Sequence, residues 1–116
     1  MSGVLSQPIA ELKAELFRSL AHPARIRVLE VLSEGERSVG EMQPLIAIES
    51  SHLSQQLGVL RRAGLVTTRK EGSTVFYGLR DPETAVLLAA AKRVLINSLA
   101  ESTELLADLR VAPSDQ

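Results

Sequence analysis

The spacing of apolar residues along the chain predicts five helices and two strands. Apolar residues recur every three or four positions in four segments before residue 64 and in a fifth segment after residue 81, which is the period of an amphipathic helix. Between these segments the period changes to two, the period of a half-buried strand. The predicted fold is therefore mostly α with a β-hairpin, in the order α-α-α-α-β-β-α. A single domain is expected over residues 8–110, with flexible tails at residues 1–7 and 111–116.

Capping residues set the predicted ends of the first two helices. The first helix covers residues 8–20 with Pro8 near its start, because proline is favoured at the first helical position. The second helix has His22 as its expected N-cap and Pro23 as its first residue. It ends at Gly35, since glycine is common just after the last turn of a helix.

The third and fourth helices form a helix-turn-helix pattern. Ser38 lies three residues before Glu41, which is the spacing of a capping box at the start of a helix. Pro44 either truncates this short third helix or lies in the following turn. The fourth helix is "IESSHLSQQLGVLRRAG" and ends at Gly64. Because the turn between the two helices is short and the second helix has a polar outer face, the pair predicts a helix-turn-helix.

A β-hairpin follows the fourth helix. The segment "LVTTRK" is rich in β-branched residues, and "TVFYGL" places Val75, Tyr77 and Leu79 on one face, as strands do. The "EGS" between them contains a glycine that suits a hairpin turn. A helix-turn-helix followed by a hairpin predicts a winged helix-turn-helix.

The outer face of the fourth helix carries hydroxyls, amides and arginine instead of the usual glutamate and lysine. With Leu53 directed inward and about 100° per residue, Ser51, Gln55, Gly58 and Arg62 form the outermost row. Serine and glutamine can read the donors and acceptors on base edges in the major groove. Gly58 either allows a close approach to DNA or is a neutral surface residue. The candidate DNA contacts in this helix are Ser50, Ser51, His52, Ser54, Gln55, Gln56, Arg61 and Arg62.

Three of these candidates have alternative interpretations. His52 is a DNA contact, a plain surface residue, or a metal ligand or catalytic base, and no second ligand lies within one turn of it. Arg61 and Arg62 either contact phosphates or stabilise the negative end of the helix dipole. The two arginine roles are compatible with each other.

Basic residues concentrate at one end of a chain whose net charge is -1. From Leu60 to Arg80 the chain has five basic residues and one acidic residue, Glu71. Basic side chains and hydroxyls beside the hairpin tip suit phosphates or the edge of the minor groove. The candidate DNA contacts in the wing are Arg69, Lys70, Ser73 and Thr74.

The last predicted helix is longer than a small domain needs. Asp81 is its expected N-cap, Pro82 is its first residue, and it continues to about Arg110. About 28 residues at ~1.5 Å each give a helix ~42 Å long. Its apolar residues cover much of its circumference, so one face needs a partner, and a second copy of the chain is the simplest partner. A ligand pocket is the alternative. The expected dimer-interface residues are Leu12, Leu16, Leu88, Leu95, Leu99 and Leu106.

The composition excludes several classes of site. The chain has no cysteine, which excludes disulfides, thiol redox sensing and thiolate metal sites. The first residues show no signal-peptide pattern, and Lys92 and Arg93 interrupt the longest apolar run, so no membrane span is expected and the cytoplasm is the expected location. The sequence shows no glycine-rich phosphate loop and no Ser/His/Asp constellation. We therefore expect neither an enzyme nor a bound cofactor.

Three segments of the chain resemble the ArsR/SmtB family of dimeric winged-helix repressors. They are "LAHPARIRVLEVL", "SSHLSQQLGVLRRAGLV" and "RKEGSTVFYGL", and each stands in the matching structural context. The resemblance covers roughly residues 10–110. It implies a homodimer built through the first and last helices, an inverted-repeat operator, and repression that an inducer relieves.

The chain departs from the metal-sensing members of the family it resembles. Where those members carry a cysteine motif on the third helix, this chain has Ser38, Val39 and Gly40. Its last helix offers carboxylates but no histidine, a poor set for soft or borderline metals. The resemblance is therefore to members without the usual metal-ligand motifs, and no metal is expected. Glu49 replaces the family's usual serine at the start of the recognition helix, so Ser50 is the expected N-cap.

The sequence as a whole predicts a sequence-specific DNA-binding transcriptional regulator. We expect a repressor that binds an inverted repeat in double-stranded DNA as a homodimer. The alternative is a winged-helix protein–protein interaction module with no specific operator, because a fold does not fix a function. For the effector, three possibilities stay open: a small apolar ligand at the dimer interface, a partner protein, and no inducer.

Overall fold

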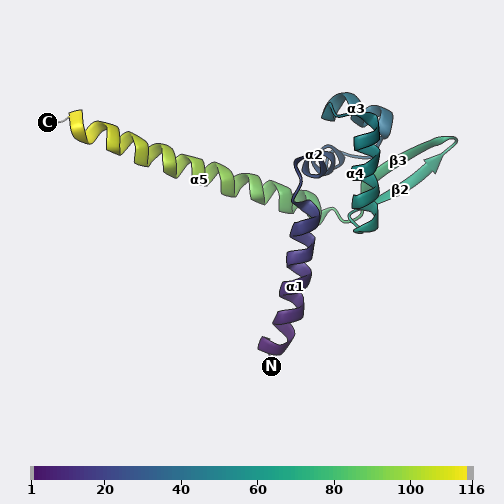
Figure 1. Cartoon of the computed structure of the whole chain (residues 1–116), viewed down its shortest axis with the longest axis horizontal. Helices are drawn as coiled ribbons and strands as arrows, with labels where there is room; N and C mark the ends of the chain where they lie inside the picture. The colour runs from purple at the N-terminus through teal and green to yellow at the C-terminus, as the bar shows by residue number, and fades with distance from the viewer. Residues whose placement is uncertain (1, 115–116) are drawn as a thin grey trace. The chain divides into compact units, whose positions relative to one another are not determined.

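The winged helix-turn-helix predicted from the sequence is present in the computed structural model, which describes residues 2–114 and the side chains of residues 7–108. Over these residues the chain forms five helices and three strands, and the helices and the hairpin can be followed in Figure 1. In chain order they are α1 (Ser2–Leu20), α2 (Pro23–Leu32), β1 (Arg37–Ser38), α3 (Val39–Ile46), α4 (Ser50–Arg62), β2 (Val66–Glu71), β3 (Thr74–Leu79) and α5 (Glu83–Ser114). They fall into two compact units, one ending at Ala85 and the other beginning at Val86.

An apolar core between α2, α3 and α4 holds the helix-turn-helix together. The largest fully buried side chains come from these helices and from the first residue of β2: Val28, Leu29, Met42, Ile46, Leu53, Leu57, Leu60 and Val66. Burial of one side chain of this size stabilises a fold by about 1.5–3 kcal/mol. Three of the eight belong to α4, so this helix is fixed by its inner face.

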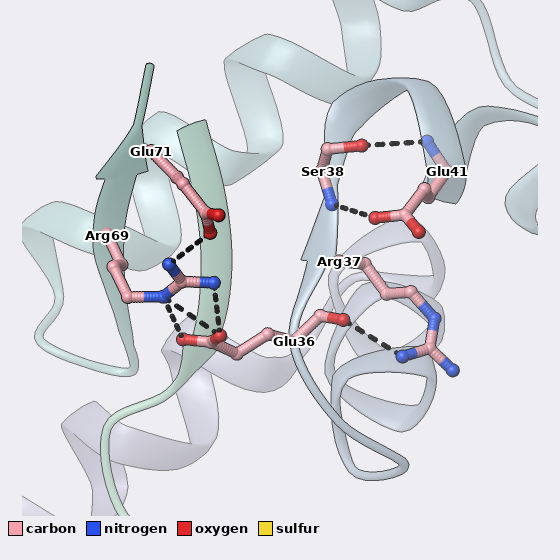
Figure 2. Close-up of polar contacts among 6 residues, drawn as sticks. All are labelled: Glu36, Arg37, Ser38, Glu41, Arg69 and Glu71. Carbon is pink, nitrogen blue, oxygen red and sulfur yellow. Dashed lines mark hydrogen bonds and ion pairs between the residues drawn. The ribbon is translucent and has the colours of Figure 1, made fainter. Parts of the chain in front are cut away.

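The N-terminal caps predicted for α2 and α3 are both confirmed, whereas α2 ends at Leu32 with Ser33 as its C-cap and not at Gly35. The Nδ1 atom of His22 accepts the backbone N–H of Ala24 at 3.1 Å, and Pro23 is the first residue of α2. At α3, the Ser38 hydroxyl accepts the N–H of Glu41 while the Glu41 carboxylate accepts the N–H of Ser38, which completes a capping box (Figure 2). The backbone N–H of Ser38 lowers the pKa of Glu41, because this hydrogen bond favours the ionised carboxylate.

The two prolines within the predicted helices lie inside helices of the structure. α1 begins at Ser2, so Pro8 lies inside it instead of near its start. A proline removes one backbone hydrogen bond, and here the helix continues on both sides of that gap. Pro44 lies inside α3, which continues to Ile46 and ends with Ala47 in the left-handed region at φ 58°.

The sheet contains one strand more than predicted. Its three strands are antiparallel in the order β1-β3-β2, so β3 lies in the middle. β1 has only two residues, too few to show the alternation by which a strand is recognised in a sequence. β2 and β3 pair along their whole length around a turn that contains Gly72 at φ +62°, as the glycine of the predicted turn requires.

From Val86 onward, α5 makes up the second unit, while its first three residues belong to the first. It has 32 residues, and the Asp81 carboxylate accepts the backbone N–H of Glu83 at its start, at 2.9 Å. It extends past the end predicted near residue 110. The predicted tails at residues 1–7 and 111–116 lie partly outside the described residues, and the domain limits of 8 and 110 stay predictions.

Candidate nucleic-acid interface

The recognition helix α4 is anchored on one side only. Leu53, Leu57 and Leu60 have no exposed surface, and the helix packs through them against α2 and α3. Gly64, at φ +77°, follows its C-terminal end, where glycine adopts the left-handed conformation without strain. The helix is thus held firmly while its opposite side faces solvent.

The outer side of α4 presents the polar row that the sequence predicts. Ser50, Ser51, Ser54, Gln55, Arg61 and Arg62 are exposed, and His52 and Gly58 are half-buried. The hydroxyl and amide groups lie in the first two turns and the two arginines in the last turn. Because α4 contains no acidic residue, this face offers hydrogen-bond donors and acceptors at one end and positive charge at the other.

Gln56 is not part of this row. Only 6% of its surface is exposed, and its Oε1 atom accepts a hydrogen bond from Nε of Arg25 at 2.7 Å. On a helical wheel Gln56 is 60° from the inward residue Leu53, so the sequence placed it at the margin of the core. In this conformation the Gln56 side chain is turned away from the exposed row, and its DNA contact stays a prediction. A buried amide oxygen needs a hydrogen-bond donor. The sequence alone did not show that Arg25 is this donor.

The N-cap of α4 is Glu49 and not Ser50, contrary to the prediction. The backbone carbonyl of Glu49 accepts the N–H of Leu53 at 2.9 Å, the first hydrogen bond of the helix. The Glu49 side chain makes no cap hydrogen bond, and its Oε1 instead accepts from the Ser51 hydroxyl at 3.0 Å. The backbone of the turn after Ala47 determines where α4 begins. The helix starts without a side-chain cap.

His52 lies next to the other histidine of the chain. The ring centroids of His52 and His22 are 5.9 Å apart, with the planes at 75°. Because Nδ1 of His22 accepts the N–H of Ala24, that nitrogen carries no proton and the ring has one donor left, at Nε2. The pair is an edge-to-face contact that joins the start of α2 to the first turn of α4.

Gly58 makes room for an arginine on the outer row. A Cβ atom placed on Gly58 would lie 3.3 Å from Nη1 of Arg62. The guanidinium of Arg62 therefore folds back over the glycine along the helix surface. A small shift of this flexible side chain would accommodate a Cβ atom, whereas glycine in a helix interior costs about 1 kcal/mol relative to alanine.

The wing holds Arg69 in a set of ion pairs (Figure 2). Its Nη1 lies 2.7 Å from Oε2 of Glu71, and its Nη2 lies 3.0 Å from Oε1 of Glu36, which also accepts from Nε. The guanidinium carbon lies 4.8 Å from the centre of the Phe76 ring, within the range of a cation–π contact. The hydrogen bonds to Glu71 and Glu36 raise the pKa of Arg69.

The other predicted wing contacts surround the hairpin tip. Lys70, Ser73 and Thr74 are exposed, and within residues 7–108 no ion pair involves Lys70. All three guanidinium nitrogens of Arg69 already have carboxylate partners, so Lys70 is the freer cation of the wing.

The comparisons with known proteins decide the family. A model of the helix-turn-helix domain matches residues 20–69. The HTH-type transcriptional regulator Rv0081 of Mycobacterium tuberculosis is 52% identical over 110 residues, which cover 94% of this chain and 96% of that protein. The chain belongs to the ArsR/SmtB family of winged helix-turn-helix transcriptional regulators. This family consists of DNA-binding regulators and not of enzymes.

The family includes both repressors and activators of transcription. The biofilm growth-associated repressor of Agrobacterium fabrum is 44% identical over 92 residues, covering 76% of this chain and 79% of the repressor. The transcriptional activator HlyU of Vibrio cholerae is 40% identical over 79 residues, covering 68% and 73% of the two chains. Similarity within the family thus shows DNA-binding regulation and does not decide between repression and activation.

Solved structures of family members share the fold. The crystal structure of Rv0081 matches with a TM-score of 0.75, covering 83% of this chain and 97% of that one. The solution structure of the winged helix-turn-helix domain of Mb0332 from Mycobacterium bovis is 26% identical and matches with a TM-score of 0.72, covering 83% and 89% of the two chains. The Mb0332 domain is homodimeric.

The helices that the family resemblance assigns to the dimer interface carry exposed apolar side chains. The exposed fraction of Leu12 on α1 is 65%, and those of Leu95, Leu99 and Leu106 on α5 are 63%, 67% and 51%. Leu16 and Leu88 are half-buried. Further exposed apolar residues on these two helices were not singled out from the sequence: Ile9, Phe17, Val86, Val94, Ile96 and Leu105.

In the described part of the chain, no group of three or more His, Cys, Asp and Glu residues is arranged to hold a metal ion. None of the helices, over the same residues, has the length and apolar character needed to cross a membrane.

Proposed function

We propose that this family member is a repressor that binds an inverted-repeat operator as a homodimer. The observation that carries the proposal is the outer row of α4. Ser51, Ser54, Gln55 and Arg62 are exposed there, without an acidic residue in the helix, while the inner leucines are fully buried. A helix anchored on one side, with groups that bind bases and phosphates on the other, has the form of a recognition helix.

In this proposal α4 lies in the major groove. Its N-terminal residues Ser51, Ser54 and Gln55 read base edges, because the first turns of a recognition helix enter the groove. Arg61 and Arg62, in the last turn, lie towards the phosphate backbone. Lys70 at the wing tip reaches a phosphate or the neighbouring minor groove, together with the hydroxyls of Ser73 and Thr74.

The proposed homodimer explains the exposed leucines of α1 and α5. A face with Leu95, Leu99 and Leu106 each more than half exposed is unusual for a side chain that meets only water, and contiguous apolar surface marks an interface. Closed two-fold symmetry is the commonest arrangement of identical chains. A dimer of this kind presents two recognition helices to half-sites about 34–36 Å apart on one face of the duplex, which requires an inverted repeat.

Repression follows if the operator overlaps a promoter, since the bound dimer then excludes the polymerase. The similarity to the Agrobacterium fabrum repressor, over three quarters of the chain, supports repression. A reporter fused to the bound promoter tests it. We expect expression to rise when the protein is deleted, and a fall would assign the activator role instead.

The DNA-binding step is tested by recovering the genomic fragments that the purified protein retains. We expect strong enrichment of one or a few promoters that share an imperfect palindrome. The variant R61Q/R62Q/K70Q should lose this enrichment, while R18Q/R27Q, which removes two exposed arginines from α1 and α2, should keep it. If the wild type shows no preference over random DNA, and a partner protein still binds the triple variant, the protein is an interaction module and the proposal fails.

A further inference from the structure

Arg25 connects two elements that the DNA-binding proposal treats separately. Its Nε donates to Oε1 of Gln56 on α4 at 2.7 Å, and its Nη1 donates to the backbone carbonyl of Ser19, in the last turn of α1, at 3.2 Å. Arg25 itself is a half-buried residue of α2. One guanidinium therefore joins the end of α1 to the inner side of the recognition helix.

The partner of Arg25 on α4 is a polar group inside an apolar surface. Among the described residues Gln56 is the one buried polar side chain, and it borders the face of α4 that carries Leu53, Leu57 and Leu60, which have no exposed surface. A buried amide without a partner is costly, so its oxygen needs the donor that Arg25 provides. Burial of the leucines holds α4 against the core, and the hydrogen bond of 2.7 Å adds a directional contact that limits the rotation of α4 about its axis.

The rotation of α4 affects base reading more than phosphate contact. Gln55 precedes Gln56 in the chain and lies on the exposed row with Ser51 and Ser54. Hydrogen bonds to base edges need well-aligned donors and acceptors, whereas attraction between arginine and phosphates depends weakly on orientation. A small rotation of α4 thus weakens recognition of the operator and leaves general DNA affinity largely intact.

The other end of the connection lies beside the proposed dimer face. Ser19 is followed by Leu20, of which 6% is exposed, and Phe17, one residue before the last turn, is 53% exposed. Among the side-chain hydrogen bonds of residues 7–108, the bond from Arg25 to Ser19 is the one that ties α1 to another helix. The planar guanidinium keeps its donors in a fixed arrangement, so a displacement of the end of α1 reaches Gln56 through this one side chain.

We propose that Arg25 is a positioning residue that sets the rotation of the recognition helix relative to the end of α1, and that operator discrimination depends on its bond to Gln56. This inference rests on the proposed DNA-binding function and names a determinant of its specificity. Arg25 acts through Gln56 and does not itself contact DNA.

The test compares binding to the operator and to a scrambled duplex of the same length. We expect R25Q and Q56L each to weaken operator binding about tenfold, which corresponds to about 1.4 kcal/mol and lies within the range of interaction energies between contacting residues. Affinity for the scrambled duplex and the slope of log K against log salt should stay at the wild-type values. The double variant R25Q/Q56L should be no weaker than the poorer single variant, and Q56E, which keeps the acceptor, should bind the operator nearly as the wild type does. R27Q is the matched control on the same helix, since Arg27 is exposed and makes no side-chain hydrogen bond or ion pair within residues 7–108.

Three results overturn the inference. Operator and scrambled affinities that fall together, with a smaller folded fraction, mean that Arg25 acts on stability alone. A salt slope that decreases by about 0.9 in R25Q and not in Q56L means that Arg25 binds a phosphate. If Q56E binds the operator as weakly as Q56L does, the acceptor at position 56 does not determine binding.

A measurement without DNA separates this inference from the proposed function. In the free protein, amide hydrogen exchange over α4 should be faster in R25Q and Q56L than in the wild type and in R27Q, while exchange over β2 and β3 is unchanged. If the wild type proves not to discriminate between DNA sequences, the proposed function fails, but this exchange result still supports or contradicts the connection between Arg25 and α4. Unchanged exchange over α4 in both variants contradicts it.

Discussion

The recognition helix and the wing each carry arginine among their exposed residues, but they hold it in opposite ways. Arg62 lies over Gly58 on α4, and no ion pair involves it within residues 7–108. Arg69 on β2 is bound by Glu36 and Glu71 and stacked on Phe76. An arginine without a carboxylate offers all of its donors to a phosphate, whereas a paired one must first release its partners. A count of basic residues therefore overstates the charge that the wing offers to DNA.

The two regions are also anchored differently. α4 is fixed by leucines without any exposed surface, so its outer residues are not needed for folding and can contact DNA. In β2 and β3 the buried residues are Val66 and Gly78, both near the base of the hairpin. Towards the tip, the wing is held by strand pairing and by surface contacts such as those of Arg69. Its charged residues thus contribute to its shape, which the corresponding residues of α4 do not need to do.

The largest expected effect tests this difference in anchoring. Leu57→Ala removes a fully buried side chain and should lower the free energy of unfolding by about 2–5 kcal/mol. Val75→Ala on β3, where 36% of the side chain is exposed, should lower it by less than about 1 kcal/mol. Urea unfolding at one fixed protein concentration measures both, because a dimer's stability depends on concentration. Equal losses in the two variants would show that the wing has a buried anchor of its own.

The next effect concerns the charges themselves. Arg62→Gln and Lys70→Gln should each reduce the slope of log K against log salt by about 0.9, because each removes one phosphate contact. Arg69→Gln should leave the slope unchanged, since its donors already serve Glu36 and Glu71. Fluorescence anisotropy with one operator duplex, over a series of salt concentrations, gives the three slopes. A slope reduced as much by Arg69→Gln as by Arg62→Gln would mean that DNA displaces the carboxylates, and the contrast between helix and wing would not hold.

What the sequence predicted correctly in these regions depends on neighbouring residues. The cap of α2 by His22 and the capping box of Ser38 and Glu41 involve groups within three positions of each other, and the helix period placed Leu53 and the outer serines on opposite faces. Local spacing determines these features, so they are readable without a structure.

What the sequence missed depends on residues that are distant along the chain. Arg69 and Glu36 are 33 positions apart, and Arg25 and Gln56 are 31 positions apart. The two residues of β1 pair with β3 from a comparable distance. Only the folded chain brings such groups together, so the sequence did not reveal the carboxylate partners of Arg69 or the bond between Arg25 and Gln56. Glu49 as the N-cap of α4 was missed for a different reason, since no side-chain cap hydrogen bond marks it.

A smaller effect is expected at Gly58, where the helix side of the comparison can be changed without removing a charge. Gly58→Ala should add up to about 1 kcal/mol of helix stability. Its methyl group would meet Nη1 of Arg62 at 3.3 Å, so the guanidinium must shift by a few tenths of an ångström. We expect a change of a few-fold in operator affinity, or about 0.5–1 kcal/mol, with an unchanged salt slope, because the charge is kept. In Arg62→Gln the same glycine substitution should no longer alter affinity, and a persisting effect would show that DNA approaches the glycine itself.

The smallest effect concerns Glu41, the carboxylate of the capping box of α3 (Figure 2). Its pKa is lowered from an ordinary value of 4.5 by the backbone N–H of Ser38. A lowered pKa in the folded state means that the cap stabilises the protein above pH 4.5, and that this contribution is lost as the pH falls through the folded pKa. Urea midpoints measured at decreasing pH should therefore fall less steeply in Glu41→Gln than in the wild type. Glu34→Gln, at an exposed carboxylate that makes no side-chain hydrogen bond within residues 7–108, should follow the wild-type curve. If Glu41→Gln also follows it, the capping box does not persist in solution, and the helix-turn-helix is held by its apolar core alone.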